Sequence, residues 1–198
     1  MGVEKMVGLV SRTGRQFQRY NKGRRQVVGC IPYRFKLAND GKISDEVEVL
    51  VISSQKGHAL MFPKGGWEID ESVEEAASRE CIEEAGVRGN IGHQLGKWDF
   101  LSKSKGTYYE GLMFPMLVTE QLELWPEQHV RQRIWMNVVE ARKACRDWWM
   151  KEALDVLVER LSSPMNNKPK EDKTISSSTE TSKKSDSKRS KIQRRKTW

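Results

Sequence analysis

The sequence has few cysteines and no long hydrophobic run. Cys30, Cys81 and Cys145 are widely spaced and form no CxxC pair, which argues against both a disulfide framework and a thiolate zinc site. No apolar stretch approaches the roughly 18 residues that a membrane-spanning helix needs, and the N-terminus lacks the apolar core of a secretory signal. We therefore expect a protein of a reducing compartment, without a membrane segment.

The length of the chain limits its domain organisation. With 198 residues there is room for one domain with a substantial core and little room for two. We place this domain at residues 26–161, after a basic N-terminal segment at residues 1–25. Residues 162–198 are rich in Ser, Thr and Lys and contain no aromatic residue before Trp198. Because they bury too little apolar area to offset the entropy of ordering, we predict that this basic tail is disordered.

Positive charge is concentrated at the two ends of the chain. The formal net charge is +8, which taken alone is typical of proteins that bind nucleic acid or another polyanion. Residues 1–36 hold nine Lys or Arg and one Glu, residues 37–160 hold fifteen and twenty-two acidic residues, and residues 161–198 hold eleven and four. The body of the protein is therefore acidic, which argues against nucleic acid as its main partner.

Hydrophobic alternation and turn residues predict a mixed order of strands and helices. Val- and Ile-rich runs predict strands, which we place at residues 26–36, 47–53, 93–101, 107–119 and 131–136. Asn39-Asp40-Gly41 marks a turn between the first two, so they are expected to form a hairpin, and the next two are expected to pair antiparallel. Residues 138–161 predict a helix with one apolar face. This order is typical of an α/β sandwich with a mixed sheet.

Residues 72–85 carry the signals of a helix with both ends defined. Ser72 followed by Glu75 is a capping box, in which each side chain satisfies the other residue's backbone N–H. Gly86 is placed to end the helix, because glycine readily adopts the left-handed conformation of the residue after a helix. One side of this helix carries only small residues, so it can pack closely against a sheet. These residues are Ala76, Ala77, Cys81 and Ala85.

Three glutamates of this helix, Glu80, Glu83 and Glu84, have i, i+3 and i+4 spacing. This spacing places their carboxylates on neighbouring positions of one face, where like charges repel. An exposed acidic face is common and is one explanation of the pattern. The other explanation is a binding site for a hard divalent cation such as Mg²⁺ or Mn²⁺, which prefers carboxylate oxygen ligands. The three residues alone leave both explanations open.

The wider pattern around these glutamates resembles the Nudix box, GX5EX7REUXEEXGU, where U is apolar. Its fixed positions are occupied here by Gly65, Glu71, Arg79, Glu80, Glu83, Glu84 and Gly86, with Cys81 and Val87 in the apolar positions. Because so many identities at fixed spacing rarely arise by chance, the chain is identified as a member of the Nudix hydrolase family. The resemblance implies a single-domain Nudix fold, an α/β/α sandwich around a mixed β-sheet, and metal-dependent hydrolysis of phosphoanhydride bonds.

The resemblance also implies roles for the glutamates of the box. Glu80 and Glu84 are expected to bind Mg²⁺ or Mn²⁺. Glu83 is expected to act either as a further metal ligand or as the general base. The metal would screen phosphate charge and lower the pKa of the attacking water.

The loop and the helix of the box are expected to form one unit. Arg79 and Glu71, which we assign to the catalytic set, are expected to pair and hold the loop against the helix. Lys64, Gly65 and Gly66 are expected to contact substrate, and the carbonyl of Lys64 or Gly65 is a further candidate metal ligand, since glycine permits a close approach of the backbone.

Segments outside the box resemble plant Nudix hydrolases related to the diphosphoinositol polyphosphate phosphohydrolases. These segments are GCIPYRF at 29–35, VLVISS at 49–54, FPKGGWE at 62–68 and the run from Trp125 to Trp135. The resemblance implies a small-molecule substrate, with diphosphoinositol polyphosphates as our first expectation. Dinucleoside polyphosphates or other nucleoside diphosphate derivatives are the second, since the same metal site would cleave them. A third hypothesis is an inactive polyanion-binding module, against which the intact box argues.

Basic residues outside the box are candidates for binding the phosphates of such a substrate. An inositol pyrophosphate carries phosphates all around its ring, so it requires cations beyond those bound by the acidic box. Arg binds phosphate through two hydrogen bonds and Lys acts as a point charge. The candidates outside the glycine loop are Arg19, Lys22, Arg24, Arg25, Lys103, Lys105, Arg131 and Arg133. For each of them the alternative is a solvated surface residue.

The ends of the chain carry two targeting patterns. The N-terminal region is rich in Arg and has no acidic residue between Lys5 and Lys36, which resembles a transit peptide. It has few serines, however, and part of it is predicted to be a strand. Basic clusters at residues 183–184, 188–189 and 194–196 resemble a nuclear localisation signal. We therefore predict cytoplasm and nucleus, with the mitochondrion as the alternative, and the sequence leaves the oligomeric state open.

Overall fold

The computed structural model describes residues 10–37, 41–55, 57, 59–102 and 105–163. Its strands are β1 (Tyr20–Asn21), β2 (Arg24–Leu37), β3 (Ile43–Ser53), β4 (Leu60–Met61), β5 (Lys64–Gly66), β6 (Val87–Ile91), β7 (Gly96–Ser102), β8 (Thr107–Gln121) and β9 (Arg133–Asn137). Its helices are α1 (Val73–Glu80), the π-helical turn η1 (Cys81–Ala85), α2 (Val138–Ala144) and α3 (Trp148–Ser162). Among these described helices, none has the length and hydropathy to cross a membrane. The basic tail predicted to be disordered falls almost entirely at residues 164–198, outside the described residues.

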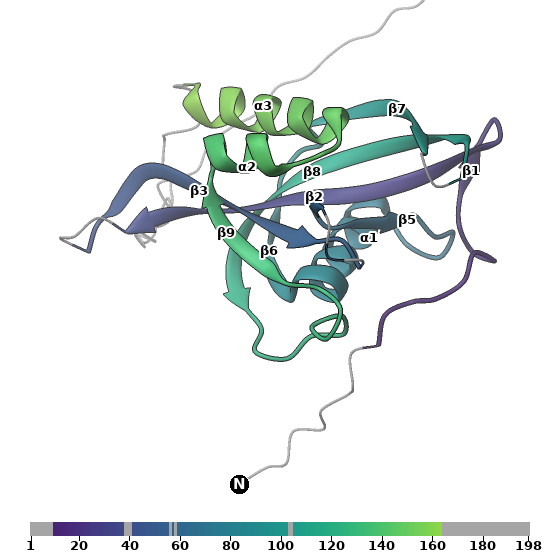
Figure 1. The fold of residues 1–198 in the computed structure, drawn as a ribbon, viewed down its shortest axis with the longest axis horizontal. Coiled ribbons are helices and arrows are strands. Elements are labelled where there is room, and N and C mark those ends of the chain that lie inside the picture. Colours follow the sequence, from purple (N-terminus) through teal and green to yellow (C-terminus); the bar gives the residue numbers. More distant parts are fainter. Residues whose placement is uncertain (1–9, 38–40, 56, 58, 103–104, 164–198) are drawn as a thin grey trace, which may run out of the picture. The chain divides into compact units, whose positions relative to one another are not determined.

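β2 lies at the centre of one mixed sheet. It pairs in parallel with β8, from Arg25 opposite Tyr109 to Tyr33 opposite Leu117, and antiparallel with β3. The main strand order is β4-β3-β2-β8-β6, with β1 and β5 paired to β2, β7 to β8 and β9 to β3 (Figure 1). The predicted hairpin is confirmed as β2 and β3, and the predicted antiparallel pair is confirmed as β7 and β8.

Each face of the sheet carries its own core, because side chains alternate between the two faces along a strand. On β3, Val49 and Val51 belong to the core that contains α2 and α3 residues, whereas Leu50 and Ile52 belong to the core that contains α1 and η1 residues. Figure 1 shows these helices on opposite sides of the sheet. The predicted sandwich of helices around a mixed sheet is therefore confirmed.

The single helix predicted at residues 138–161 is wrong, because the structure has two helices there. α2 ends at Ala144, and Cys145 is extended, with ψ 126°. Cys145 is buried and forms an isolated bridge with Leu60, so a tertiary backbone contact overrides the local helical pattern. The predicted apolar face persists in α3, whose buried residues are Trp149, Met150, Ala153, Leu154 and Leu157.

Four strands of the sheet were not predicted. β1 and β4 have two residues each and β5 has three, which is too short for an alternating pattern. β6 has the sequence VRGNI, and its Gly and Asn are among the residues least favoured in strands. Pairing with β8 makes it a strand. The predicted strand at residues 93–101 begins only at Gly96.

Candidate active site

The helix that carries the glutamates begins and ends as the sequence predicts. The Ser72 hydroxyl accepts a hydrogen bond from the Glu75 backbone N–H at 3.2 Å, and the Glu75 carboxylate accepts one from the Ser72 N–H at 2.7 Å. At the other end, Gly86 has φ 61° and ψ 40°, the left-handed conformation that glycine adopts without steric cost. The position of the helix along the chain is therefore fixed at both ends.

The last turn of this helix, η1, is π-helical, which the sequence does not predict. The Gly86 N–H donates to the carbonyl oxygens of both Cys81 and Ile82, so the turn is wider than an α-helical turn. Ala77, Cys81 and Ala85 are fully buried and pack against the sheet. Their small size lets the helix lie close to the sheet, which brings the glutamates beside the strands.

The glycine loop of the box is a short strand, β5. It pairs with residues 27–29 of β2, so its backbone is fixed to the centre of the sheet. A Cβ at Gly65 would overlap the carboxylate of Glu80. Only glycine at this position leaves room for that carboxylate beside the backbone.

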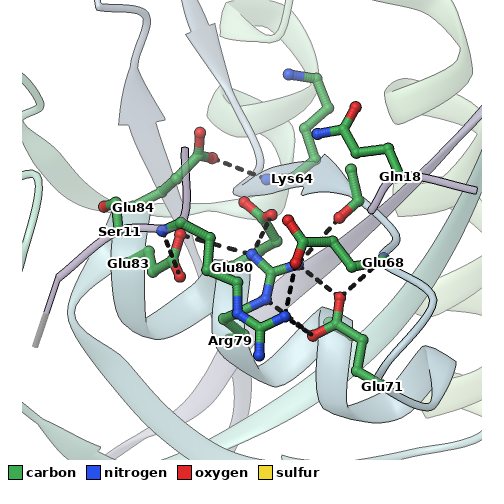
Figure 2. A network of polar contacts seen from close by, with 12 residues as sticks. Ser11, Gln18, Lys64, Glu68, Glu71, Arg79, Glu80, Glu83 and Glu84 are labelled. Atoms are coloured by element: carbon green, nitrogen blue, oxygen red, sulfur yellow. Dashed lines mark hydrogen bonds and ion pairs between the residues drawn. The ribbon is translucent and has the colours of Figure 1, made fainter. Parts of the chain in front are cut away.

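Arg79 connects the loop to the helix. Its guanidinium donates two hydrogen bonds to the Glu71 carboxylate, at 2.8 and 2.9 Å, and one to the Gly66 carbonyl at 3.0 Å. It also donates to Glu80 at 2.7 Å and lies 3.5 Å from the Glu83 carboxylate, as Figure 2 shows. Burial disfavours the charge of Arg79, but its bond to Glu71 and the charge of Glu80 raise its pKa above the ordinary value. Arg79 therefore remains charged and holds several carboxylates at once.

The three glutamates of the box are buried, with relative exposures of 6% for Glu80, 7% for Glu83 and 6% for Glu84. An exposed acidic surface therefore does not explain their spacing. Burial raises the pKa of each carboxyl group. For Glu80 the neighbouring charge of Glu84 adds to the effect of burial, and together they raise the pKa to about 8. A cation bound among these groups would favour their ionised forms again.

Glu84 is held by partners from separate segments. Its carboxylate accepts a hydrogen bond from the Lys64 backbone N–H at 2.8 Å and another from the guanidinium of Arg131. Arg131 is itself buried and donates to Glu127 at 2.6 Å and to the Ser53 carbonyl at 3.0 Å. One arginine thus joins the end of β3, the segment before β9 and the glutamate helix.

The chemistry of these residues fits a hard divalent cation, since carboxylate oxygens are its preferred donors. In the part of the chain that the structure describes, no three acidic, His or Cys side chains form a ready set of metal ligands. Arg79 is bonded to one carboxylate oxygen of Glu80, and Arg131 to one of Glu84.

A cavity of about 760 Å³ lies beside the glutamates. Its acidic lining residues are Glu68, Glu80, Glu83, Glu84, Glu127 and Asp147, and its basic lining residues are Arg12, Arg15, Arg25, Lys64, Arg79, Lys105 and Arg146. Half of the acids come from one helix, whereas the cations come from segments spread over the chain from the N-terminal region to the α2–α3 connection. This distribution suits an anion that carries several phosphates.

The structure brings some of the predicted substrate-binding residues to this cavity. Those that line it are Arg25, Lys64, Gly65, Gly66 and Lys105, whereas Lys103 lies outside the described residues. The guanidinium of Arg25 donates to the side chain of Gln18 and lies 5.4 Å from the centre of the Tyr109 ring. These contacts hold Arg25 beside the cavity, near the start of β2.

Arg19 and Arg24 do not belong to the cavity lining and have partners of their own. Arg19 lies 4.5 Å from the centre of the Trp67 ring and donates to the carbonyls of residues 68 and 69. Arg24 pairs with Asp99. These contacts give both arginines a structural explanation.

Arg133 supports the end of the glutamate helix. Its guanidinium lies 4.0 Å from the centre of the Trp125 ring and donates to the carbonyls of Ala85, Gly86 and Leu122. It thus satisfies carbonyl groups that a helix end leaves unpaired. Because Arg133 and Arg131 are both engaged within the protein, we do not expect them to bind substrate.

Six charged residues of the lining were not singled out as site residues in the sequence: Arg12, Arg15, Glu68, Glu127, Arg146 and Asp147. For the first two, the Arg-rich composition of the N-terminal segment was the only signal. Glu127 lies between β8 and β9, and its backbone N–H donates to the Glu83 carbonyl at 3.1 Å. No local spacing relates it to the box, because the contact depends on how β8 returns across the sheet.

Residues 23–157 match the family model of the NUDIX domain. Nudix hydrolase 17, mitochondrial, of Arabidopsis thaliana is 90% identical over 181 residues, which cover 91% of this chain and 99% of the relative. Nudix hydrolase 18, mitochondrial, of the same plant is 85% identical over 157 residues, which cover 79% and 89%. The chain therefore belongs to the Nudix hydrolase family. It is an enzyme that acts on small-molecule phosphoanhydride substrates, and members of its family generally use divalent metals.

More distant relatives carry more specific names. Diphosphoinositol polyphosphate phosphohydrolase 3-alpha of Mus musculus is 34% identical over 124 residues, which cover 62% of this chain and 70% of the relative. A NUDIX hydrolase from Nitrosomonas europaea superposes with a TM-score of 0.56 at 18% identity, covering 76% of this chain and 99% of the other. A C. elegans Ap4A hydrolase, in a binary complex, superposes with a TM-score of 0.53 at 22% identity, covering 69% and 96%. At these identities the two structures show the shared fold alone.

The prediction of cytoplasm and nucleus is contradicted by the relatives. The two that are 90% and 85% identical are both named mitochondrial, which favours the alternative given above. The prediction relied on residues 26–36 being a strand, and they do form part of β2. This strand begins at Arg24, so it was no argument about the basic residues before it, which resemble a transit peptide.

Proposed function

We propose that this enzyme removes phosphate from diphosphoinositol polyphosphates in a reaction that depends on Mg²⁺ or Mn²⁺. The observation that carries the proposal is the cavity, in which half of the acidic residues come from one helix and the cations come from several segments. A small ring with phosphates on many sides matches that distribution, since each phosphate needs a cationic partner. The name of the mouse relative, a diphosphoinositol polyphosphate phosphohydrolase, adds support.

In this proposal Glu80 and Glu84 hold the metal, and Glu83 is a further ligand or the general base. When bound, the metal would supply charge screening for the phosphates and a lower pKa for the attacking water. Arg79 pairs with Glu71 and Glu80 and so keeps the loop and the carboxylates in a fixed relation. No covalent enzyme intermediate is required.

The proposed substrate contacts are those that line the cavity. Lys64 and Arg25 would bind phosphates, the first as a point charge and the second through paired hydrogen bonds. Gly65 and Gly66 would allow phosphate oxygens to approach the backbone. Further cations in the lining are Arg15, Lys105 and Arg146.

A nucleoside-based substrate, such as a dinucleoside polyphosphate, is the alternative, and the fold shared with a C. elegans Ap4A hydrolase is its support. A base would need an aromatic platform, and the described lining contains the rings of Phe100 and Tyr109. Phe100 stacks on Trp149 with ring centres 4.6 Å apart and an interplanar angle of 9°, and Arg25 lies over Tyr109. One face of each ring is therefore already covered, and a base could stack only on the other face.

A substrate panel tests the proposal. The purified full-length chain is assayed for hydrolysis of an inositol pyrophosphate, diadenosine tetraphosphate, ADP-ribose and NADH, with Mg²⁺ or Mn²⁺ and with EDTA. Phosphate release is measured for the inositol pyrophosphate, and the nucleotide products of the other three substrates are separated by chromatography. We expect the highest kcat/KM for the inositol pyrophosphate and no hydrolysis with EDTA. A higher kcat/KM for diadenosine tetraphosphate would support the alternative instead. No hydrolysis of any substrate with either metal would point to a polyanion-binding module that lacks catalysis.

The substrate assignment has its own test in Arg25. Replacing Arg25 by Ala should weaken the binding of an inositol pyrophosphate, in a salt-sensitive way, more than it weakens the binding of diadenosine tetraphosphate. The control is Arg88→Ala, which removes an exposed pair with Glu120 outside the lining. Equal losses on both substrates would reject the inositol assignment and leave phosphoanhydride hydrolysis in place.

For the location, the names of the two similar Arabidopsis proteins support the mitochondrion. The acid-free segment before β2 is the part of the sequence that would act as the targeting signal. Fractionation of a C-terminally tagged chain tests this. Recovery in the mitochondrial fraction is the expected result, and recovery in the cytosol alone would contradict it.

A further inference from the structure

The geometry points to Arg12 as a positioning residue of the active site: it ties an N-terminal strap, residues 11–19, across the box and thereby orients Glu83. This inference depends on the hydrolysis common to the family and is independent of the substrate proposed above. The strap lies before residue 23, where the match to the NUDIX domain begins. The strap is therefore not part of the residues that match the NUDIX domain.

The strap is bonded to the loop of the box along its length. The Arg19 N–H donates to the Trp67 carbonyl at 2.7 Å, and the Ile69 N–H donates to the Phe17 carbonyl at 2.8 Å. Gln18 and Glu68 form an isolated antiparallel bridge between these bonds. The strap thus runs antiparallel beside residues 67–69. Its preceding residues lead to Arg12, which lies beside the glutamates.

Arg12 makes two kinds of contact with the site. Its guanidinium donates to the Glu68 carboxylate at 2.6 Å and to the Asp70 carboxylate at 2.9 Å, and it lies 3.9 Å from Glu71. Its backbone N–H donates to the Glu83 carboxylate at 3.2 Å. The side chain is thus anchored to the loop while the main chain contacts a glutamate of the helix.

A second contact of the strap reaches the opposite side of the site. The Ser11 hydroxyl donates to the Glu127 carboxylate at 3.3 Å, and the Glu127 N–H in turn donates to the Glu83 carbonyl. Both the main chain and the side chain of Glu83 are therefore in contact with the strap or with a residue bound to it. Figure 2 shows Ser11 and Glu83 close together in this network.

An ion pair made by an exposed arginine is usually weak, and the side chain of Arg12 is 40% exposed. Its partner Glu68, however, is only 10% exposed, so the cation compensates a carboxylate that has lost most of its water. The bond also restricts the main chain at residue 12, where the N–H meets Glu83. Loss of the side chain should therefore release the contact between the Arg12 N–H and Glu83. A displacement of about 1 Å is enough to break this contact, and a misplacement of that size can lower the rate by up to about a hundredfold.

The competing explanation is that Arg12 lines the cavity only to bind substrate phosphate. The two explanations make opposite predictions for Glu68→Gln. If Arg12 acts through Glu68, removing the carboxylate releases the strap and lowers the rate. If Arg12 binds phosphate directly, removing its acidic partner leaves a more available cation and does not lower the rate.

The experiment compares Arg12→Ala, Glu68→Gln and the double variant in the full-length chain. We expect each single variant to lower kcat by about tenfold or more with KM changed less than about twofold, and the double variant to be no slower than either single one, because the two residues act as a unit. Arg12→Lys should restore part of kcat, since Lys can form one of the ion pairs. The matched control is Arg142→Ala, which removes an arginine bonded to Asp155 at 2.7 and 2.9 Å outside the cavity lining.

A measurement without turnover follows the strap directly. Trypsin cleavage after Arg15 should be faster in Arg12→Ala and in Glu68→Gln than in the wild type or in Arg142→Ala, because a released segment is more accessible. A rise in KM with unchanged kcat in Arg12→Ala, or an unchanged kcat in Glu68→Gln, would overturn the inference. If the wild type hydrolyses nothing in the panel, the proposed function fails. The strap is then judged by trypsin, and equal cleavage rates reject it.

Discussion

The two faces of the sheet are packed with side chains of different size. On the face of α1 and η1 the buried apolar helix residues are Ala76, Ala77, Cys81 and Ala85. On the face of α3 they are Trp149, Met150, Ala153, Leu154 and Leu157. The first set brings a helix backbone close to the sheet and the second fills a deep core.

This difference in size separates chemistry from stability. Each large side chain buried on the α3 face contributes about 1.5–3 kcal/mol to the free energy of unfolding. No charged residue of the box lies on this face. The α1 face contributes less apolar area and contains three buried carboxylates whose pKa values are raised by burial. The stability of the second face thus allows the first to hold groups that oppose folding.

The comparison predicts its largest effect at the glutamates. Glu80→Gln or Glu84→Gln should lower kcat roughly 10²–10⁴-fold, the range typical of a lost essential carboxylate. The free energy of unfolding in the absence of metal should change little for Glu80→Gln, because the raised pKa of this carboxyl group favours its neutral form, which the amide resembles. Steady-state kinetics and thermal unfolding measure the two quantities.

The control for this prediction lies on the same helix. Glu74 is exposed in its first turn, so Glu74→Gln should change neither quantity appreciably. A Glu80→Gln variant with a near wild-type rate would remove this residue from the mechanism.

The opposite face should show a loss of stability without a loss of rate. Leu154 is fully buried in α3, and Leu154→Ala should lower the free energy of unfolding by about 2–5 kcal/mol, through lost burial and a cavity. The rate per folded molecule should stay close to that of the wild type at a temperature where the variant is folded. Leu154→Met, which conserves volume, should cost less than about 1.5 kcal/mol. A large fall in kcat for folded Leu154→Ala would show that the two faces are coupled.

Metal should stabilise the protein, and more so at high pH. Burial and the charge of Glu84 raise the pKa of Glu80 from 4.5 to about 8. The protonated form is then favoured in the folded state, so the stability it contributes is complete below about pH 4.5 and is lost as pH rises toward 8. A bound cation compensates for that loss, and at about 100 times its Kd it stabilises by about 2.7 kcal/mol. Thermal unfolding with and without Mn²⁺ should show a larger shift at about pH 8 than at about pH 5.5; equal shifts would argue against these carboxylates as the ligands.

We expect the smallest effect from a matched pair of substitutions, one on each face of the sheet. Ala77 in α1 and Ala153 in α3 are both fully buried, and a valine at either position should cost about 1–3 kcal/mol by overpacking. Only Ala77→Val should also lower kcat, because it moves the glutamate helix away from β5. Similar kcat values for the two variants would contradict the idea that close packing of small residues positions the carboxylates.

The local features of the site could be predicted from the sequence, and the contacts between distant segments could not. The capping box at Ser72 and the left-handed Gly86 depend on residues a few positions apart, so their pattern is visible in the chain. Arg131 meets Glu84 from 47 positions away and Arg12 meets Glu83 from 71. These contacts follow from the pairing of β9 with β3 and from the bonds between the strap and residues 67–69, which no local pattern specifies.

The same limit applies to the fold. The predicted hairpin and the predicted sandwich depend on alternation and turn residues, which are local properties. The break at Cys145 depends on its bridge with Leu60, and the edge strand β6 depends on β8. In both places the partner determines the local conformation, and the partner lies far along the chain.

The bond between Arg12 and Glu83 also bears on how the protein could be matured. Many proteins imported into an organelle lose their targeting segment to a processing peptidase, and in this chain such a cut would fall before β2. A cut after residue 12 would remove the residue whose N–H meets Glu83 and whose guanidinium binds Glu68. A fully active mature enzyme would then require a cleavage point on the N-terminal side of Ser11, so that the site of maturation and the geometry of catalysis constrain each other.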